Sequence, residues 1–151
     1  MIEPDHLLDL TRRELALTTR GAPRQANLRR AGSTVYYAVF HALSNEVANA
    51  FWRSSGPAWL LFYRALDHGA ARKRCEQIGT RFSLAFQNFA NAFVELQQFR
   101  HSCDYDPSFR VAKTDLAHAI RDAANAIIGL RKSPEGEKTE FLAYVLLGRH
   151  R

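Results

Sequence analysis

Apolar residues recur along the chain at intervals of three and four positions, the spacing that places side chains on one face of a helix. The pattern is clearest in residues 80–103, where phenylalanine dominates it. The same rhythm runs through residues 108–132 and through residues 23–53, where apolar residues fill two neighbouring stripes. These stretches predict three long amphipathic helices around one core. Their apolar positions are Leu28, Val35, Tyr36, Val39, Phe40, Ala42, Leu43, Val47 and Ala50, then Phe82, Phe86, Phe89, Phe93, Leu96 and Cys103, and finally Leu116, Ile120, Ala123, Ile127 and Leu130.

Shorter helical patterns cover residues 4–19, 57–66 and 137–147, and residues 70–78 fit a short basic helix less clearly. The five prolines stand at the borders of these segments, as expected of a residue that starts or ends helices. Gly21-Ala22-Pro23 breaks the first segment from the second. Long helices with short connections favour an all-α fold, an up-and-down bundle of five to six helices.

Composition supports the helical prediction. Alanine and leucine together number 39, against 11 for valine and isoleucine, a balance that favours helix over sheet. With 151 residues, 46% of them hydrophobic, the chain fits a single domain spanning residues 1–151. No apolar run approaches the ~20 residues of a membrane span, and residues 1–9 lack the basic start of a secretory signal. We therefore expect a cytoplasmic protein without a membrane partner, in which Cys75 and Cys103 are reduced structural thiols.

The formal net charge is +6, and basic residues cluster in residues 24–30, 72–74 and 149–151. A basic surface attracts polyanions such as RNA. The alternative is that the charges are spread over the surface and form no patch. No metal-ligand spacing, phosphate loop or serine-nucleophile motif occurs in the sequence. We therefore expect no cofactor and no metal.

The most informative residue is Arg100, which occupies a position on the apolar stripe between Leu96 and Cys103. A charged group there is costly unless it is paired or reaches water. One interpretation is an arginine at the helix end that is clamped to Asp104 or Asp106. The other is a guanidinium that faces a cleft because it binds phosphate.

A line of polar residues follows residues 23–53, at intervals of three and four that place them on one face of the helix. This face is either the solvent side of the helix or the wall of a groove. The histidines are mostly expected at the surface, although Arg64 and His68 are four positions apart and could face together. The line consists of Arg30, Ser33, Tyr37, His41 and Ser44.

Two segments carry a resemblance to a known family. Residues 28–43 read Leu-Arg-Arg-Ala-Gly-Ser-Thr-Val-Tyr-Tyr-Ala-Val-Phe-His-Ala-Leu, and this string resembles the HEPN domain branch with a Tyr-Tyr-Ala-x-Phe-His core. Residues 100–105, Arg-His-Ser-Cys-Asp-Tyr, are similar to the helix end of the same branch, Arg-x-x-Ala-Asp-Tyr. The resemblance covers residues 8–132 and leaves the helix at 137–147 outside the family core. It implies an up-and-down bundle that pairs as a homodimer across a cleft.

Many HEPN proteins are metal-independent RNases whose working motif is an arginine followed, after four to six residues, by a histidine. In that chemistry arginine steadies charge on the scissile phosphate and histidine moves protons. Here the residue after four intervening positions from Arg100 is Tyr105, and a phenol, with a pKa of about 10, is a poor proton carrier at neutral pH. His101 is adjacent to Arg100, about 100° around the helix, and therefore does not take the place of the motif histidine. Arg100, Tyr105 and His41 remain candidates for catalysis without a complete motif.

We therefore expect a HEPN-like domain that binds RNA or another phosphate-bearing ligand in a dimer cleft. The expected ligand-binding residues are Arg30, Ser33, Tyr37, His41, Arg100, Asp104 and Tyr105. The first alternative is a metal-independent endoribonuclease toxin with a nucleotidyltransferase-like or other antitoxin as its partner. The second is a structural dimerisation module without a nucleic-acid role, in which Arg100, Asp104 and Tyr105 hold the helix end together.

Overall fold

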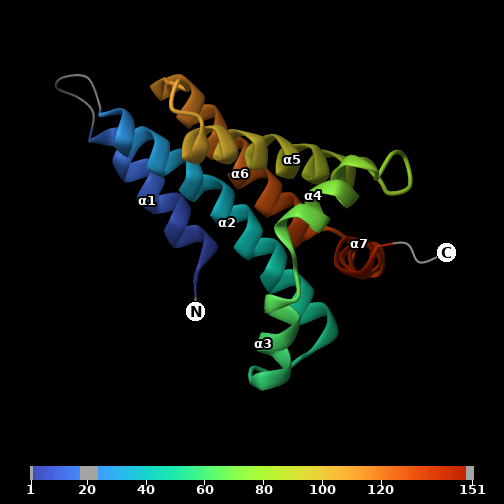
Figure 1. The fold of residues 1–151 in the computed structure, drawn as a ribbon. Coiled ribbons are helices and arrows are strands. Elements are labelled where there is room, and N and C mark those ends of the chain that lie inside the picture. Colours follow the sequence, from blue (N-terminus) through green and yellow to red (C-terminus); the bar gives the residue numbers. More distant parts are fainter. Residues whose placement is uncertain (1, 18–23, 149–151) are drawn as a thin grey trace.

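A computed structural model describes residues 2–17 and 24–148, and within these residues the chain forms seven helices and no strand (Figure 1). The predicted all-α fold is confirmed. The helices are α1 (Pro4–Ala16), α2 (Gln25–Phe51), α3 (Pro57–Arg64), α4 (His68–Glu76), α5 (Leu84–Tyr105), α6 (Lys113–Lys132) and α7 (Glu135–Leu147). The predicted break at residues 21–23 and the basic cluster at 149–151 lie outside the described residues.

The helix count differs from the predicted five to six because the short basic stretch after residue 68 is a separate helix. Asp67 caps it: its carboxylate accepts a hydrogen bond of 2.7 Å from the backbone N–H of Ala70. Prolines open α1 and α3, where the missing N–H has no helical partner in any case. The cap at Asp67 therefore marks the start of α4, which the hydrophobic spacing alone does not indicate clearly.

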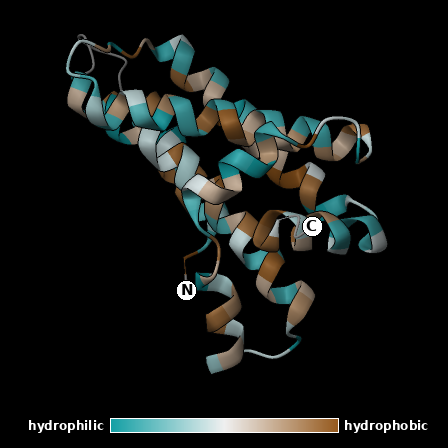
Figure 2. Ribbon diagram, turned by 45° about the vertical axis from the view of Figure 1, so that its right-hand side comes forward, coloured by the Kyte–Doolittle hydropathy of each residue, from teal (hydrophilic) through white to brown (hydrophobic). Residues whose placement is uncertain are grey.

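Helix α2 lies at the centre of the fold and contacts α1, α3, α5, α6 and α7. Tyr36, Leu43 and Val47 on its apolar stripe have no exposed surface. Ala50 is the exception: the prediction that it is buried is wrong, because it lies in the last turn of α2 and is exposed. In Figure 2 hydrophobic and hydrophilic residues alternate along the long helices, which is the pattern of helices that bury one face and expose the other.

The phenylalanine stripe of α5 and the aliphatic stripe of α6 are buried as predicted. Helix α7 adds to the same core through Phe141, whose ring centroid lies 5.5 Å from that of Phe82 and 4.8 Å from that of Phe86. Burial of one such ring contributes about 1.5–3 kcal/mol. In the part of the chain that the structure describes, no helix has the length and apolar character needed to cross a bilayer.

Candidate phosphate-binding site

The site lies where the first half of α2 meets the C-terminal end of α5, and Arg29 fixes this junction. The Arg29 guanidinium donates to backbone carbonyl oxygens at the end of α5 and in the loop that follows: to Cys103 at 2.7 Å, Asp106 at 2.6 Å, Phe109 at 3.2 Å and Ser102 at 3.4 Å. A cation is favourable at a helix C-terminus, where carbonyl groups lack helical partners. Arg29 therefore ties α5 to α2 and leaves a positive charge at the junction.

Four of the predicted site residues meet beside this anchor. The Nε atom of Arg100 forms an ion pair with Oδ2 of Asp104 at 2.8 Å, and its Nη2 donates to the hydroxyl oxygen of Tyr37 at 2.9 Å. The same Oδ2 accepts a hydrogen bond of 3.2 Å from the Ser33 hydroxyl. The Nε–H of Arg100 is not aligned for a regular hydrogen bond, so the contact with Asp104 is mainly electrostatic. The clamp between Arg100 and Asp104 that the spacing allowed is present, whereas Asp106 turns its carboxylate to Ser108 instead.

Tyrosine rings surround the Arg100 guanidinium. Its central carbon lies 5.4 Å from the ring centroid of Tyr37, 5.6 Å from that of Tyr105 and 6.0 Å from that of Tyr36. A cation within about 6 Å of an aromatic face is attracted to it. The Arg100 side chain retains 19% of its exposure, while Tyr105 retains 63% and forms the outer edge of the cluster. Arg100 is therefore held in a fixed position that still reaches solvent.

A groove of about 500 Å³ opens next to this cluster. Arg100 does not line the groove itself; it lies behind it, in contact with Tyr37 and Asp104. Arg30 is exposed at the groove. Among the lining residues, Arg29 and Arg30 outweigh the single carboxylate of Asp104, which Arg100 already pairs, so the lining carries positive charge. Its lining is formed by Ala26, Arg29, Arg30, Ser33, Thr34, Tyr37, Cys103 and Asp104.

Only the first three residues of the predicted polar line, Arg30, Ser33 and Tyr37, line the groove. His41 lies one turn beyond Tyr37, where its Nδ1 forms a hydrogen bond with the hydroxyl of Tyr63 from α3 and the two rings stack at 5.9 Å. Burial lowers the pKa of His41. Ser44 is fully buried and belongs to the core. The line therefore splits into groove residues at its start and covered residues at its end.

His68 is the residue near the site that the sequence analysis did not place there. Its Nδ1 lies 2.7 Å from the Tyr36 hydroxyl, and its ring stacks on Phe40 with a centroid distance of 3.7 Å. Burial, followed by the charge of Arg100, lowers the pKa of His68. Its imidazole is therefore neutral at neutral pH. The His68 ring packs on Phe40. Arg64, which the sequence places four positions before His68, ends α3 and is exposed, whereas His68 begins α4.

The only local signal for His68 is the Asp67-His68 pair at a helix start, which predicts a cap and not a contact with a residue 32 positions earlier. Among the described residues, no group of histidine, cysteine, aspartate and glutamate could hold a metal ion. Cys75 and Cys103 are free, buried thiols, and burial raises the pKa of Cys103 to about 11. The chemistry available here is therefore that of guanidinium, imidazole, phenol and carboxylate groups.

Comparison of the chain with protein-family models, with curated proteins and with solved structures finds no match.

Proposed function

We propose that the chain is a HEPN-like domain that binds RNA through its phosphates in the groove between α2 and α5, and that it acts as a homodimer with this groove in the dimer cleft. The observation that carries the proposal is a groove whose lining holds Arg29 and Arg30, while its one carboxylate, Asp104, is already paired with Arg100. Paired guanidinium groups suit phosphate because their planar donors match its oxygens.

Each residue has a separate role in this proposal. Arg30 is exposed, and its guanidinium has no partner among the described residues, so it is the group that contacts phosphate directly. Arg100 adds positive charge behind the groove wall, and Asp104 and Tyr37 hold its guanidinium in position. The exposed Tyr105 ring offers a face on which an unpaired base can stack, which favours single-stranded RNA.

The test is fluorescence anisotropy with a labelled single-stranded RNA and the variants Arg30→Ala and Arg100→Ala. Arg30→Ala removes a direct phosphate contact, so it should weaken binding by about ten-fold and reduce the slope of log affinity against log salt by about one. Arg100→Ala removes a charge behind the groove and should also weaken binding. The matched control is Arg53→Ala. Arg53 is exposed just beyond the other end of α2, on the order of 35 Å from Arg30 at 1.5 Å per residue of helix.

Two results decide against RNA binding. In the first, both groove variants bind RNA as tightly as the wild type does. In the second, Arg100→Ala loses its helical circular-dichroism signal and Arg30→Ala binds normally. The second result favours the structural module, in which Arg100, Asp104 and Tyr105 only hold the end of α5 together.

A second candidate, a metal-independent endoribonuclease, is favoured by the imidazole of His68, which lies close enough to Arg100 to feel its charge and whose pKa burial lowers. In such a reaction the ribose 2′-hydroxyl loses its proton to a base and attacks phosphorus, and the departing 5′-oxygen takes a proton from an acid. His68 is a better candidate than Tyr105 for the base, because a neutral imidazole accepts a proton at neutral pH. As a toxin, the enzyme would have a nucleotidyltransferase-like antitoxin as its partner.

The endoribonuclease is tested by incubating RNA with the protein in EDTA and examining the ends of the products. Fragments with 2′,3′-cyclic phosphate ends that disappear in His68→Ala and persist in His101→Ala support it. His101 is the control because it is exposed on the same helix end as Arg100. RNA that stays intact at high protein concentration excludes cleavage and leaves binding as the function.

A further inference from the structure

A second hollow, of about 440 Å³, lies between α1 and α2 beside the α2–α5 groove. Arg30 and Thr34, one turn apart on α2, line both the groove and this α1–α2 hollow, so they form the wall that the two share. The Thr34 hydroxyl donates to the backbone carbonyl oxygen of Arg30 at 2.9 Å. The exposed side chain of Arg30 therefore borders both openings.

The polar side chains of the α1–α2 hollow differ from those of the groove. Thr11 is fully buried, and its hydroxyl donates to the carbonyl oxygen of Leu8 at 2.7 Å. Glu14 is half-buried and Asn27 is exposed, and neither side chain has a partner in residues 2–17 and 24–148. Glu14 is also the one carboxylate among the described residues that line the hollow. Its two oxygens are therefore free to accept hydrogen bonds from a ligand.

The walls of the α1–α2 hollow disfavour phosphate and suit an uncharged organic group. The Glu14 carboxylate repels a phosphate. The hollow also presents apolar surface, because Leu10 is 51% exposed and Ala31 is a further lining residue. Sites for small organic groups combine apolar walls with a few polar groups that fix the orientation of the ligand. An uncharged group of this kind, joined to a phosphate that Arg30 contacts, is the base of a nucleotide.

The bases of RNA differ in the donors that they present to a carboxylate. Guanine has two adjacent donors, N1–H and the N2 amino group, which match the two carboxylate oxygens. Adenine and cytosine place their amino group next to a ring nitrogen that accepts hydrogen bonds, and uracil places its N3–H between two carbonyl oxygens. In these three bases, at least one carboxylate oxygen would face another acceptor. A carboxylate such as that of Glu14 therefore selects guanine.

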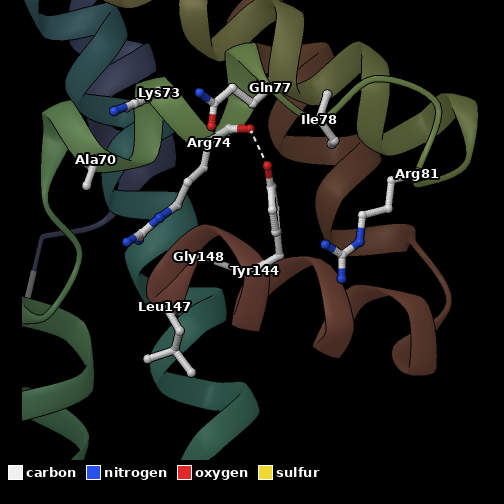
Figure 3. A pocket seen from close by; sticks show the side chains of 9 residues that line it. All are labelled: Ala70, Lys73, Arg74, Gln77, Ile78, Arg81, Tyr144, Leu147 and Gly148. Carbon is white, nitrogen blue, oxygen red and sulfur yellow. Dashed lines mark hydrogen bonds between the residues drawn. The ribbon is translucent and has the colours of Figure 1, made fainter. Parts of the chain in front are cut away.

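The basic hollow between α4 and α7 lacks this combination of groups (Figure 3). Figure 3 shows Tyr144 between the side chains of Arg74 and Arg81. The Nη1 atom of Arg74 already donates to the backbone carbonyl oxygens of Val145 and Leu146. No carboxylate stands among the described residues that line this hollow. It therefore serves as a control location for base selection.

We infer that the α1–α2 hollow holds the base of the nucleotide whose phosphate Arg30 contacts, and that Glu14 makes this position specific for guanine. The inference rests on the proposed RNA binding in the α2–α5 groove. The single strand crosses α2 at Arg30, with its phosphate on that arginine and the N1–H and N2 amino edge of guanine on Glu14. The amide of Asn27 is the donor available for the guanine O6 atom.

The experiment is fluorescence anisotropy of the full chain with a labelled oligouridylate and with the same strand carrying one central guanine, adenine, cytosine or hypoxanthine. We expect the guanine strand to bind about ten-fold more tightly than the uracil, adenine and cytosine strands. Hypoxanthine keeps N1–H but lacks the N2 amino group, so its strand should bind with intermediate affinity. Glu14→Gln and Glu14→Ala should abolish the preference for guanine and bind oligouridylate at least as tightly as the wild type does.

The matched control is Asp9→Asn, which removes an exposed carboxylate of α1 outside the hollow and should keep the preference for guanine. Lys73→Ala, in the hollow between α4 and α7, should keep it as well. Arg30→Ala should weaken binding of every strand. Equal binding of all strands by the wild type, or a guanine preference that survives in both Glu14 variants, overturns the inference and leaves RNA binding in the groove intact. If no strand binds, the proposed function fails and the inference fails with it.

Discussion

Gly32 on α2 lies directly against Cys103 on α5: a Cβ atom on Gly32 would be 2.7 Å from the Cys103 sulfur and 2.9 Å from a ring carbon of Phe99. A residue larger than glycine at this position would therefore have to displace the side chain of Cys103 or Phe99. The crossing is immediately next to Arg29 and Ser33, which contact the end of α5. Its close packing thus sets the position of the candidate phosphate-binding groove.

Gly32→Ala should destabilise the fold by about 1–3 kcal/mol, because the new methyl group overpacks the crossing. Urea denaturation measures the change in the free energy of unfolding. The double variant Gly32→Ala/Cys103→Ala should recover part of the loss, since removal of the sulfur gives the methyl group room. Cys103→Ala alone should not stabilise the protein.

Gly129→Ala is the matched control, because Gly129 lies within α6 and a Cβ atom there would meet nothing within 4 Å. Alanine is a better helix former than glycine by about 1 kcal/mol, so this variant should be as stable as the wild type or more so. If Gly32→Ala is as well tolerated as Gly129→Ala, the helices can separate at the crossing and the groove is not fixed by it.

The sequence predicts the long helices and the start of the site because both depend on regular spacing. The phenylalanine stripe of α5 is buried as its period requires, and Arg100 and Asp104 pair because residues four apart meet on a helix. The contacts of His41 with Tyr63 and of His68 with Tyr36 are different. They depend on how α3 and α4 fold back on α2, and no local pattern encodes that path.

Arg29→Lys tests whether the anchor at the end of α5 needs the guanidinium. Lysine keeps the positive charge, but its single nitrogen cannot reach all the carbonyl oxygens that Nε, Nη1 and Nη2 of Arg29 contact. Loss of these charge-assisted hydrogen bonds should lower the free energy of unfolding by about 1.5–3 kcal/mol, as measured in urea. RNA affinity should fall as well, because the end of α5, which carries Asp104, is then less firmly held against α2.

Arg24→Lys, at an exposed position just before α2, is the control for this substitution and should change neither property. Unchanged stability of Arg29→Lys would mean that the ammonium or water satisfies the carbonyl groups equally well, and that the guanidinium is not the anchor.

Stability should fall as the pH drops from about 7.5 to about 5, because burial lowers the pKa of both His41 and His68 below the usual 6.5. The unfolded chain then takes up protons before the folded chain does, which favours unfolding. The stabilising effect is complete above the unfolded pKa and is lost as the pH falls through the folded values. Asp106, whose pKa is lowered mainly by hydrogen bonds from Ser108, affects only more acidic solutions.

The measurement is the free energy of unfolding in urea at several pH values in this window, for the wild type and for His68→Gln. The variant should show a shallower dependence on pH whatever its absolute stability. His118→Gln, which changes an exposed histidine on α6, should keep the slope of the wild type. Equal slopes for the wild type and His68→Gln would show that the imidazole is not held neutral by burial.

Substitution of Tyr105 distinguishes a role of this residue in RNA binding from a role in holding the end of α5. Its ring is 63% exposed, and its centroid lies 5.6 Å from the guanidinium carbon of Arg100. Tyr105→Ala should change stability by no more than about 0.5 kcal/mol. If a base stacks on this ring, the same variant should weaken single-stranded RNA binding by about 1–3 kcal/mol, while Tyr105→Phe should bind nearly as well as the wild type. Anisotropy and urea denaturation on both variants give the two readouts. A large stability loss in Tyr105→Ala with no change in RNA affinity would place Tyr105 among the groups that hold the end of α5, and would remove it from the binding surface.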